Sequence, residues 1–359
     1  MPPRRIGGLE VKVFAAVCAA ILAALTTATS GGAPPQSEQD APLRLSWEAP
    51  MPNVHGRLDH LAIDTKHERV ILTALGNNTV EIYQLSENKF IHSIVGLDDP
   101  QAAVYVPEFD KLLVSDDNGK VWIYDGSTYK LLNVIDYGAD GNADNMRYDP
   151  MSKKIYISFG DGSDSAIGTI DPATDKPTEE LYKLNFHAES FQLEQSGARI
   201  FANIPEADHI IAVIDRKTHQ ISKWQVAGQA NFPMALDEPD HRLFVGTRVP
   251  PELFVLDTDT GKTVASMPVA GDTDDLYYDA ALRRIYVIGG VGSISVFQQK
   301  DPDHYEHVAD IHTSVGARTG FFLGASGAYG GRYGVPPLYV AVPERAGHPA
   351  ALWSFGTYQ

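Results

Sequence analysis

A repeat of about 43 residues constrains the fold of this chain more than any other feature of its sequence. Runs of β-branched and aromatic residues begin at Val70, Leu112, Ile155, Ile200, Leu243, Ile285 and Leu338. The starts of successive runs lie 42, 43, 45, 43, 42 and 53 residues apart. A near-constant period of this length indicates an array of supersecondary units that pack against their neighbours.

Each repeat has the pattern of four short strands. In the third repeat, the triplet Arg147-Tyr148-Asp149 precedes the run Ile155-Tyr156-Ile157, a third run spans residues 167–170, and turn residues separate them. The fourth strands are weaker, as at residues 221–226. Four strands in about 43 residues are typical of a propeller blade. The sequence therefore predicts an all-β fold, a seven-bladed β-propeller with four-stranded blades.

The two ends of the repeat array are predicted to complete one blade. The seventh repeat reaches the end of the chain after its third strand, and residues 43–47 (Leu-Arg-Leu-Ser-Trp) alternate apolar and polar residues as a strand does. Pairing of this N-terminal strand with the seventh repeat would close the ring and remove two free sheet edges. We therefore assign residues 43–359 to the propeller.

Several strand motifs also resemble those of a known family. The segments are Ile155-Tyr-Ile-Ser, Ile285-Tyr-Val-Ile, Leu338-Tyr-Val-Ala and Asn77-Asn-Thr-Val. They resemble the YVTN-type β-propeller repeats of bacterial exported proteins, over nearly all of the chain from residue 43. That resemblance implies a periplasmic or surface propeller. A more distant likeness, based on propeller form and acidic loops, links the chain to gluconolactonases and regucalcin, whose six blades surround a metal site of carboxylates and amides.

The N-terminal segment has the order of a secretory signal. Arg4, Arg5 and Lys12 precede an apolar run over residues 13–25, and a small-residue stretch follows. We predict a signal peptide at residues 1–30, a disordered tether at residues 31–42, and a periplasmic or extracellular location without membrane insertion of the mature chain. Cys18 is the single cysteine, so the mature chain would lack disulfides, thiolate metal sites and c-type haem attachment, and we predict no haem.

Charge restricts the partners. The chain has a formal net charge of −17, and without residues 1–30 it holds 26 Lys+Arg against 45 Asp+Glu. This charge repels nucleic acid and anionic lipid and favours cations or basic partners. We expect a monomer that binds a small molecule or a protein.

Many of the aspartates have a structural explanation. Eight of them end a strand where a turn begins: Asp64, Asp125, Asp149, Asp171, Asp215, Asp237, Asp257 and Asp279. We expect these side chains to accept hydrogen bonds from turn amides.

The remaining acidic residues concentrate on one predicted face. The loops that enter each first strand, and those between second and third strands, emerge on the same side of a propeller, here called the upper face. They carry seventeen acidic residues against four arginines, Arg57, Arg248, Arg318 and Arg345. Such segregation of charge predicts that the upper face carries the functional site. Turn preferences alone could also produce part of this segregation.

Alignment of the repeats places chemically varied residues at one position around the central channel. The residues at this position are Asp59, Gln101, Asp144, Glu189, Phe232, Asp274 and Thr319. The next residue along the chain is also polar in several repeats, namely His60, Asn145, Ser190 and Asp275. Slightly earlier in their loops lie Asn142, His187 and Asn231. Asp59, Asp144, Asn145, Glu189 and Asp274 are candidate ligands of a divalent ion, Ca²⁺ or else Mg²⁺, Mn²⁺ or Zn²⁺. The alternative is that these groups line a water-filled channel.

Cationic groups gather where the seventh and first repeats meet. Arg318 and Arg345 belong to the seventh repeat, and Arg57, His55 and His60 to the first. Arginines beside the acidic opening of the central channel would suit a ligand that carries both an anionic group and a cationic or metal-binding group. The alternative is that Arg57 and Arg318 pair locally with Asp59 and Asp274.

Two classes of function follow. The first is a binding or scaffold protein that engages a small cationic or zwitterionic ligand, or a protein partner, at the acidic opening of the central channel. Its further candidate ligand-binding residues are Gln101, Asn142, Asn231, Asp275 and Arg345. The second is a metal-dependent hydrolase or lyase acting on a lactone-like substrate, in which His60 or His187 is the general base and Arg318 or Arg57 polarises the substrate oxygen. A third, a subunit of a redox enzyme with its cofactor on another chain, has no support from particular residues.

Overall fold

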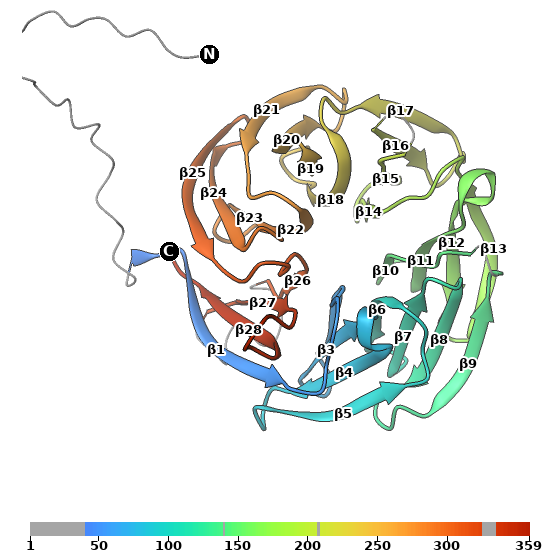
Figure 1. Ribbon diagram of the computed structural model, residues 1–359. Helices are drawn as coiled ribbons and strands as arrows, with labels where there is room; N and C mark the ends of the chain where they lie inside the picture. The colour runs from blue at the N-terminus through green and yellow to red at the C-terminus, as the bar shows by residue number, and fades with distance from the viewer. Residues whose placement is uncertain (1–39, 139–140, 207–208, 325–334) are drawn as a thin grey trace, which may run out of the picture. The chain divides into compact units, whose positions relative to one another are not determined.

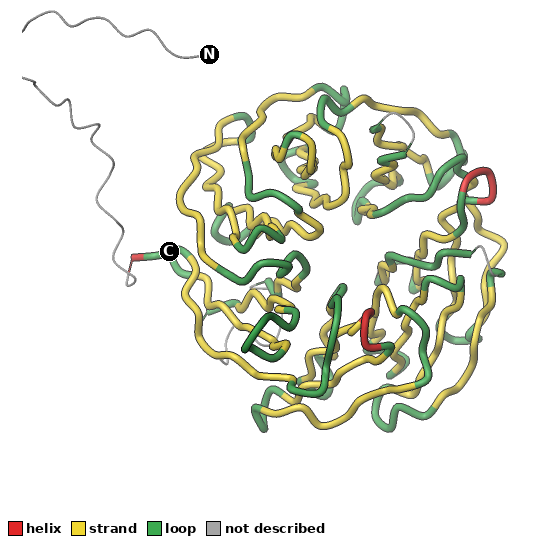
Figure 2. Tube along the Cα trace, viewed as in Figure 1, coloured by secondary structure: helices red, strands yellow, loops and turns green. Residues whose placement is uncertain are grey.

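Seven four-stranded antiparallel sheets are arranged around a central axis, which confirms the predicted seven-bladed β-propeller (Figure 1). The computed structural model describes residues 40–138, 141–206, 209–324 and 335–359. The predicted signal peptide and residues 31–39 of the predicted tether lie outside these residues. Strands form most of the ring, and short loops connect them (Figure 2).

In each of the first three blades the strands follow the chain from the centre outward. Blade one contains β2 (Leu61–Asp64), β3 (Arg69–Ala74), β4 (Thr79–Gln84) and β5 (Lys89–Val95). Blade two contains β6 (Pro100–Val106), β7 (Lys111–Asp116), β8 (Lys120–Asp125) and β9 (Leu131–Asp136). Blade three contains β10 (Met146–Asp149), β11 (Lys154–Phe159), β12 (Ala166–Asp171) and β13 (Lys176–Lys183).

The next three blades repeat this order. Blade four contains β14 (Ser190–Leu193), β15 (Arg199–Ile204), β16 (Ile210–Asp215) and β17 (Ile221–Gln225). Blade five contains β18 (Gln229–Asp237), β19 (Arg242–Val249), β20 (Pro251–Asp257) and β21 (Thr263–Pro268). Blade six contains β22 (Thr273–Asp279), β23 (Arg284–Gly289), β24 (Ser293–Asp301) and β25 (His304–His312).

Blade seven combines strands from both ends of the described chain. Its order is β26 (Gly320–Phe322), β27 (Pro337–Val342), β28 (Ala350–Thr357) and then β1 (Leu43–Met51). β1 pairs antiparallel with β28 from Leu43 opposite Thr357 to Met51 opposite Ala350. Residues 43–47, predicted to be a strand of the seventh blade, thus lie in its outermost strand.

Within the propeller blades, the described residues contain two short 3₁₀ turns, η2 (Leu75–Asn77) and η3 (Gly162–Asp164). In this part of the chain no helix has the length and apolar character needed to cross a membrane.

The core lies between the faces of neighbouring sheets. Between blades three and four, for example, Tyr156 and Ile167 pack in one buried cluster with Phe191, Ile200 and Ile214. Complete burial of one such side chain stabilises the fold by about 1.5–3 kcal/mol relative to its exposure. Each blade therefore depends on both of its neighbours for burial, which holds the loops of separate repeats in fixed relative positions.

Seven of the eight turn aspartates make the predicted hydrogen bonds. Asp125, for example, accepts hydrogen bonds from the backbone amides of Ser127 and Thr128 at 3.2 and 2.8 Å. Hydrogen bonds to turn residues are also made by Asp64, Asp149, Asp171, Asp215, Asp257 and Asp279. Asp237 differs, because its carboxylate accepts a hydrogen bond from the Gln299 side chain at 3.1 Å.

Candidate functional site

The predicted ring position forms a polar pocket at one end of the central channel. This pocket, of about 230 Å³ and here called the mouth pocket, is lined by Arg57, Asp59, His60, Gln101, Asp117, Asn142, Asp144, Glu189, Phe232, Arg248 and Asp274. The residues come from six of the seven blades, and Phe232 is the single apolar side chain among them. Most of them lie at or near the start of an innermost strand, whereas Asp117 and Arg248 lie at the end of a second strand or just after it.

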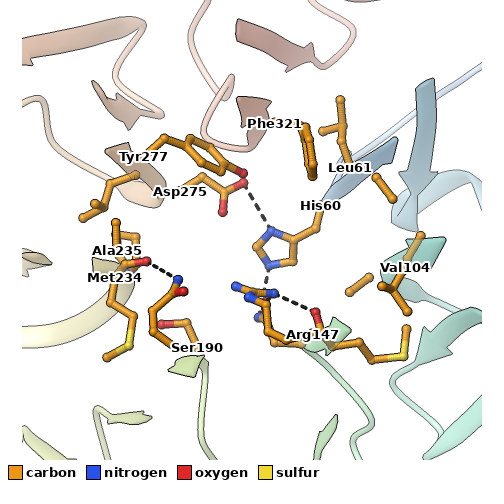
Figure 3. Close-up of a pocket in the computed structure, with 18 of the residues that line it drawn as sticks. His60, Leu61, Val104, Arg147, Ser190, Met234, Ala235, Asp275, Tyr277 and Phe321 are labelled. Carbon is orange, nitrogen blue, oxygen red and sulfur yellow. Dashed lines mark hydrogen bonds and ion pairs between the residues drawn. The ribbon is translucent and has the colours of Figure 1, made fainter. Parts of the chain in front are cut away.

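A second cavity of about 390 Å³ continues along the inner strands and is here called the channel. His60 and Asp274 line both cavities. The channel wall is mixed, with the apolar side chains of Val104, Met234 and Phe321 arranged around His60, Arg147 and Asp275 (Figure 3). A molecule that entered at the mouth would therefore pass from a charged rim to a mixed polar and apolar interior.

Two arginines bridge the carboxylates on one side of the mouth pocket. Arg57 Nη2 donates to Asp59 Oδ2 at 3.1 Å and lies 3.7 Å from Asp274 Oδ2. Arg248 Nη2 lies 2.8 Å from Asp274 Oδ1, and its guanidinium stacks 3.8 Å from the centre of the Phe232 ring. The sequence left open local pairing of Arg57 with Asp59, and that pairing is present.

Glu189 and Asp117 are the carboxylates of the mouth pocket without a partner in the described chain, and Glu189 is the more deeply placed of the two, with the larger rise in pKa. Among the described residues the Glu189 side chain has no ion pair and no hydrogen bond, whereas Asp59, Asp144 and Asp274 each lie within 4.0 Å of a cationic side chain. Burial, reinforced by the charge of Asp144, raises the pKa of Glu189 to about 7. A partly buried carboxylate with a raised pKa and no partner is a candidate binding group.

Two further oxygens in the pocket lack hydrogen-bond donors. Asp59 Oδ1 and Asp274 Oδ2 are buried and without a hydrogen bond in the described structure. Burial raises the pKa of both groups, that of Asp59 to about 7. Since an unsatisfied buried carboxylate oxygen is costly, these atoms favour a donor or cation from outside the chain.

The neighbouring carboxylates favour the protonated form of both histidines considered as general bases, His60 and His187. Burial disfavours the charged form of His60, but the Asp275 carboxylate 3.2 Å from Nδ1, with Asp59 and Asp144, raises its pKa to about 10. Burial also opposes charging of His187, but Asp144, 3.6 Å from Nε2, raises its pKa to about 9. A protonated imidazole must first lose its proton before it can act as a general base, and the neighbouring carboxylates oppose that loss.

The predicted metal ligands lie near one another without converging. Asp59, Asp144, Glu189 and Asp274 line the mouth pocket, whereas Asn145 lines the channel below it. Among the residues with described positions, no three His, Cys, Asp or Glu side chains form a group able to hold a metal ion. Asn145 instead donates from Nδ2 to the Glu189 backbone carbonyl at 2.5 Å.

Three predicted residues have structural roles away from the mouth pocket. Asn231, on β18, is wholly buried and donates to the Asn203 side chain of blade four at 3.0 Å. Arg318 pairs with Asp272 at 2.9 Å, and not with Asp274 as considered from the sequence. Arg345 donates to the Val315 carbonyl at 2.6 Å. Part of the predicted cationic corner is present, since Arg57, Arg318 and Arg345 line one surface pocket, whereas His60 lines the mouth pocket and His55 pairs with Glu344 at 2.7 Å.

The other predicted ligand-binding residues do reach the cavities. Gln101 and Asn142 line the mouth pocket, and Asn142 Nδ2 lies 3.4 Å from Asp161 Oδ1. Asp275 lines the channel, where its Oδ2 accepts a hydrogen bond from the Gly320 amide at 2.9 Å and faces His60.

Sequence reasoning missed two important side chains. Arg248, assigned only to an upper loop, reaches across to the mouth pocket from the end of β19. Arg147, treated as part of a strand motif, lines the channel. The available signal for Arg147 was its charge at a position where the other repeats carry uncharged residues.

Comparison with known proteins identifies the fold and no more. No protein-family model matches the sequence, and no curated protein matches it. Among many solved chains of similar structure is one in the crystal structure of the mitotic checkpoint complex. It aligns with a TM-score of 0.69 and 12% sequence identity over 88% of this chain and 92% of that chain. The resemblance to the YVTN-type repeat family therefore stays a prediction.

Proposed function

We propose that this protein is an exported binding protein that holds a small organic cation at the mouth pocket. The observation that carries the proposal is the unpaired carboxylate of Glu189, which faces a pocket containing two further carboxylate oxygens without donors. Arg57 and Arg248 compensate Asp59 and Asp274 in part, so a ligand cation would complete the charge balance of the pocket. An ammonium group suits this site because it offers several N–H donors to separated oxygens.

The fold is compatible with this role. A β-propeller commonly acts as a scaffold or binding module, and the similar chain in the mitotic checkpoint complex belongs to a protein assembly. A protein partner that presents a lysine side chain to the mouth pocket is therefore a second form of the same proposal. Export rests on the charged, apolar and small-residue order of residues 1–30, which would direct the protein to the periplasm or the cell exterior.

A matched pair of variants tests the role of Glu189. We expect Glu189→Gln to weaken the binding of pentylammonium by about tenfold to a hundredfold, because a charge-assisted hydrogen bond contributes roughly 1.5–3 kcal/mol. Glu252→Gln removes the same charge from an upper-face position outside the mouth pocket, and it should change affinity by less than about twofold. Titration calorimetry measures both.

The pH dependence of the same affinity provides an independent check. Because the pKa of Glu189 is raised to about 7, its carboxylate loses its charge as the pH falls from 8 to 6, while pentylammonium stays charged. Affinity should therefore fall on acidification, and less steeply in Glu189→Gln, where Asp59, with its pKa also raised to about 7, still titrates. Equal loss of affinity in Glu189→Gln and Glu252→Gln would contradict the proposal.

A further inference from the structure

Arg147 is a charged residue at a repeat position where the other six blades have uncharged residues. The residue at this position lines the channel in every blade. The equivalent residues, matched by their pairing with the second strand of each blade, are Ala62, Val104, Arg147, Gln192, Ala235, Tyr277 and Phe321, and all seven line the channel. Six of these side chains are uncharged, so the fold does not require a cation here. The arginine lines the same cavity as His60 (Figure 3).

One edge of the Arg147 guanidinium has free donors. Its Nη1 donates to Asn145 Oδ1 at 3.1 Å and to the Met146 carbonyl at 2.8 Å. In the described chain Nε and Nη2 make no hydrogen bond, and these two atoms form the edge that presents parallel donors to a carboxylate. Phe191 supports the group from one side, with its ring centre 5.6 Å from the guanidinium carbon.

The acidic groups near Arg147 already face other partners. Asp275 lies 3.2 Å from His60 Nδ1 and accepts from the Gly320 amide, and Asp144 lies 3.6 Å from His187. No carboxylate of the described residues lies within 4.0 Å of the Arg147 nitrogens. Burial lowers the pKa of Arg147 despite the more distant negative charges, which agrees with a cation that has no direct counter-ion.

We propose that the channel binds a carboxylate group at the Nε/Nη2 edge of Arg147, and that the ligand of this protein is an organic zwitterion. This inference rests on the proposed function, since the ammonium end would lie at Glu189. Asn145 links the two subsites, because its Oδ1 accepts from Arg147 and its Nδ2 donates to the Glu189 carbonyl. The apolar channel side chains Val104, Met234 and Phe321 suit a hydrocarbon segment next to the carboxylate.

Three probes with one carbon skeleton separate the two subsites: pentylammonium, pentanoate and 5-aminopentanoate. With the wild-type protein, 5-aminopentanoate should bind at least about tenfold more tightly than either single-charge probe. Arg147→Gln should abolish pentanoate binding and this advantage while pentylammonium affinity stays within about twofold. Glu189→Gln should show the reverse pattern, with pentanoate affinity retained.

The outcomes distinguish this inference from the proposed function. Pentylammonium binding without any gain for 5-aminopentanoate would overturn the carboxylate subsite and leave the mouth pocket intact. Pentanoate binding without pentylammonium binding would support Arg147 and contradict the role of Glu189. Should Arg147→Gln fail to fold, pentanoate binding to the wild type and to Glu189→Gln still decides the matter, because absence of binding to both would refute the subsite.

Discussion

Replacement of Arg248 by glutamine is expected to lower the free energy of unfolding by about 3 kcal/mol, because it leaves a buried carboxylate without its closest cation. Arg248 lies 2.8 Å from Asp274, whose side chain is 9% exposed, and Asp274 Oδ2 already lacks a hydrogen bond. Arg57, at 3.7 Å, would compensate only in part. Chemical denaturation at neutral pH measures the loss.

The double variant Arg248→Gln/Asp274→Asn is the matched control. Removing the carboxylate together with the arginine removes both charges of this pair and leaves neither partner uncompensated, so stability should return to within about 1 kcal/mol of the wild type. The loss in Arg248→Gln should also shrink at acidic pH, because burial raises the pKa of Asp274 and the protonated group needs no cation. Failure of the second substitution to restore stability would show that Arg248 acts through something other than Asp274.

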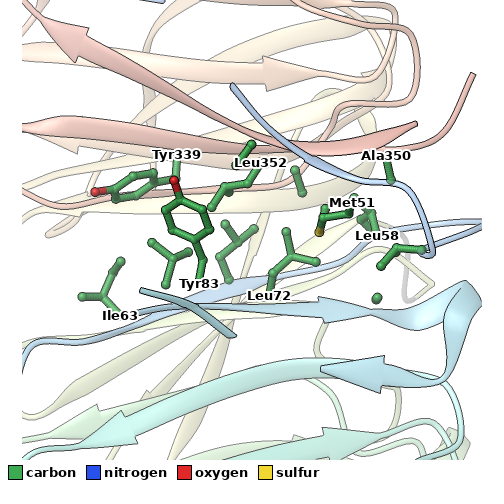
Figure 4. Packing of buried hydrophobic residues seen from close by; sticks show 14 of the residues in the cluster. Met51, Leu58, Ile63, Leu72, Tyr83, Tyr339, Ala350 and Leu352 are labelled. Carbon is green, nitrogen blue, oxygen red and sulfur yellow. The ribbon is translucent and has the colours of Figure 1, made fainter. Parts of the chain in front are cut away.

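Replacement of Leu352 by alanine should cost about 2–5 kcal/mol of stability, because it opens a cavity in the core between blades seven and one. Leu352, on β28, is fully buried in a cluster that includes Met51 of β1 and Leu72 and Tyr83 of blade one (Figure 4). The N-terminal strand, the C-terminal strand and the first blade thus share one core. A thermal or denaturant unfolding curve gives the size of the effect.

Leu45 provides the control for this substitution. It is also a leucine of the blade-seven sheet, but it lies on the outer strand β1 with 45% of its surface exposed. Leu45→Ala should change stability by less than about 0.5 kcal/mol. Similar losses in the two variants would mean that burial between blades seven and one does not stabilise the ring.

The repeat allowed much of the fold and part of the site to be predicted from sequence. A period of about 43 residues implies seven equivalent blades, and equivalent positions must then lie at one level around the axis. For this reason Asp59, Gln101, Asp144, Glu189, Phe232 and Asp274 were assigned correctly to one ring, and all six line the mouth pocket. Topology, rather than the identity of any single residue, carried these predictions.

Side-chain reach and local partners could not be predicted in the same way. Arg248 enters the pocket because its long side chain stacks on Phe232, and the direction of an arginine is not fixed by its place in a repeat. Asn231 lies next to the ring position in sequence but is buried against Asn203, since neighbouring residues of a strand point in different directions. Pairing of Arg318 with Asp272 in place of Asp274 likewise depends on the conformation of two loops.

A crystal structure with bound 4-bromobenzylammonium would test the central claim most directly, because anomalous scattering locates the bromine independently of any assumed site. We expect the probe in the mouth pocket, its ammonium nitrogen within hydrogen-bond distance of the Glu189 carboxylate and its ring directed into the channel. A probe bound at another surface, with the mouth pocket empty, would contradict the account, as would carboxylates of Asp59, Asp144, Glu189 and Asp274 that do not share one pocket.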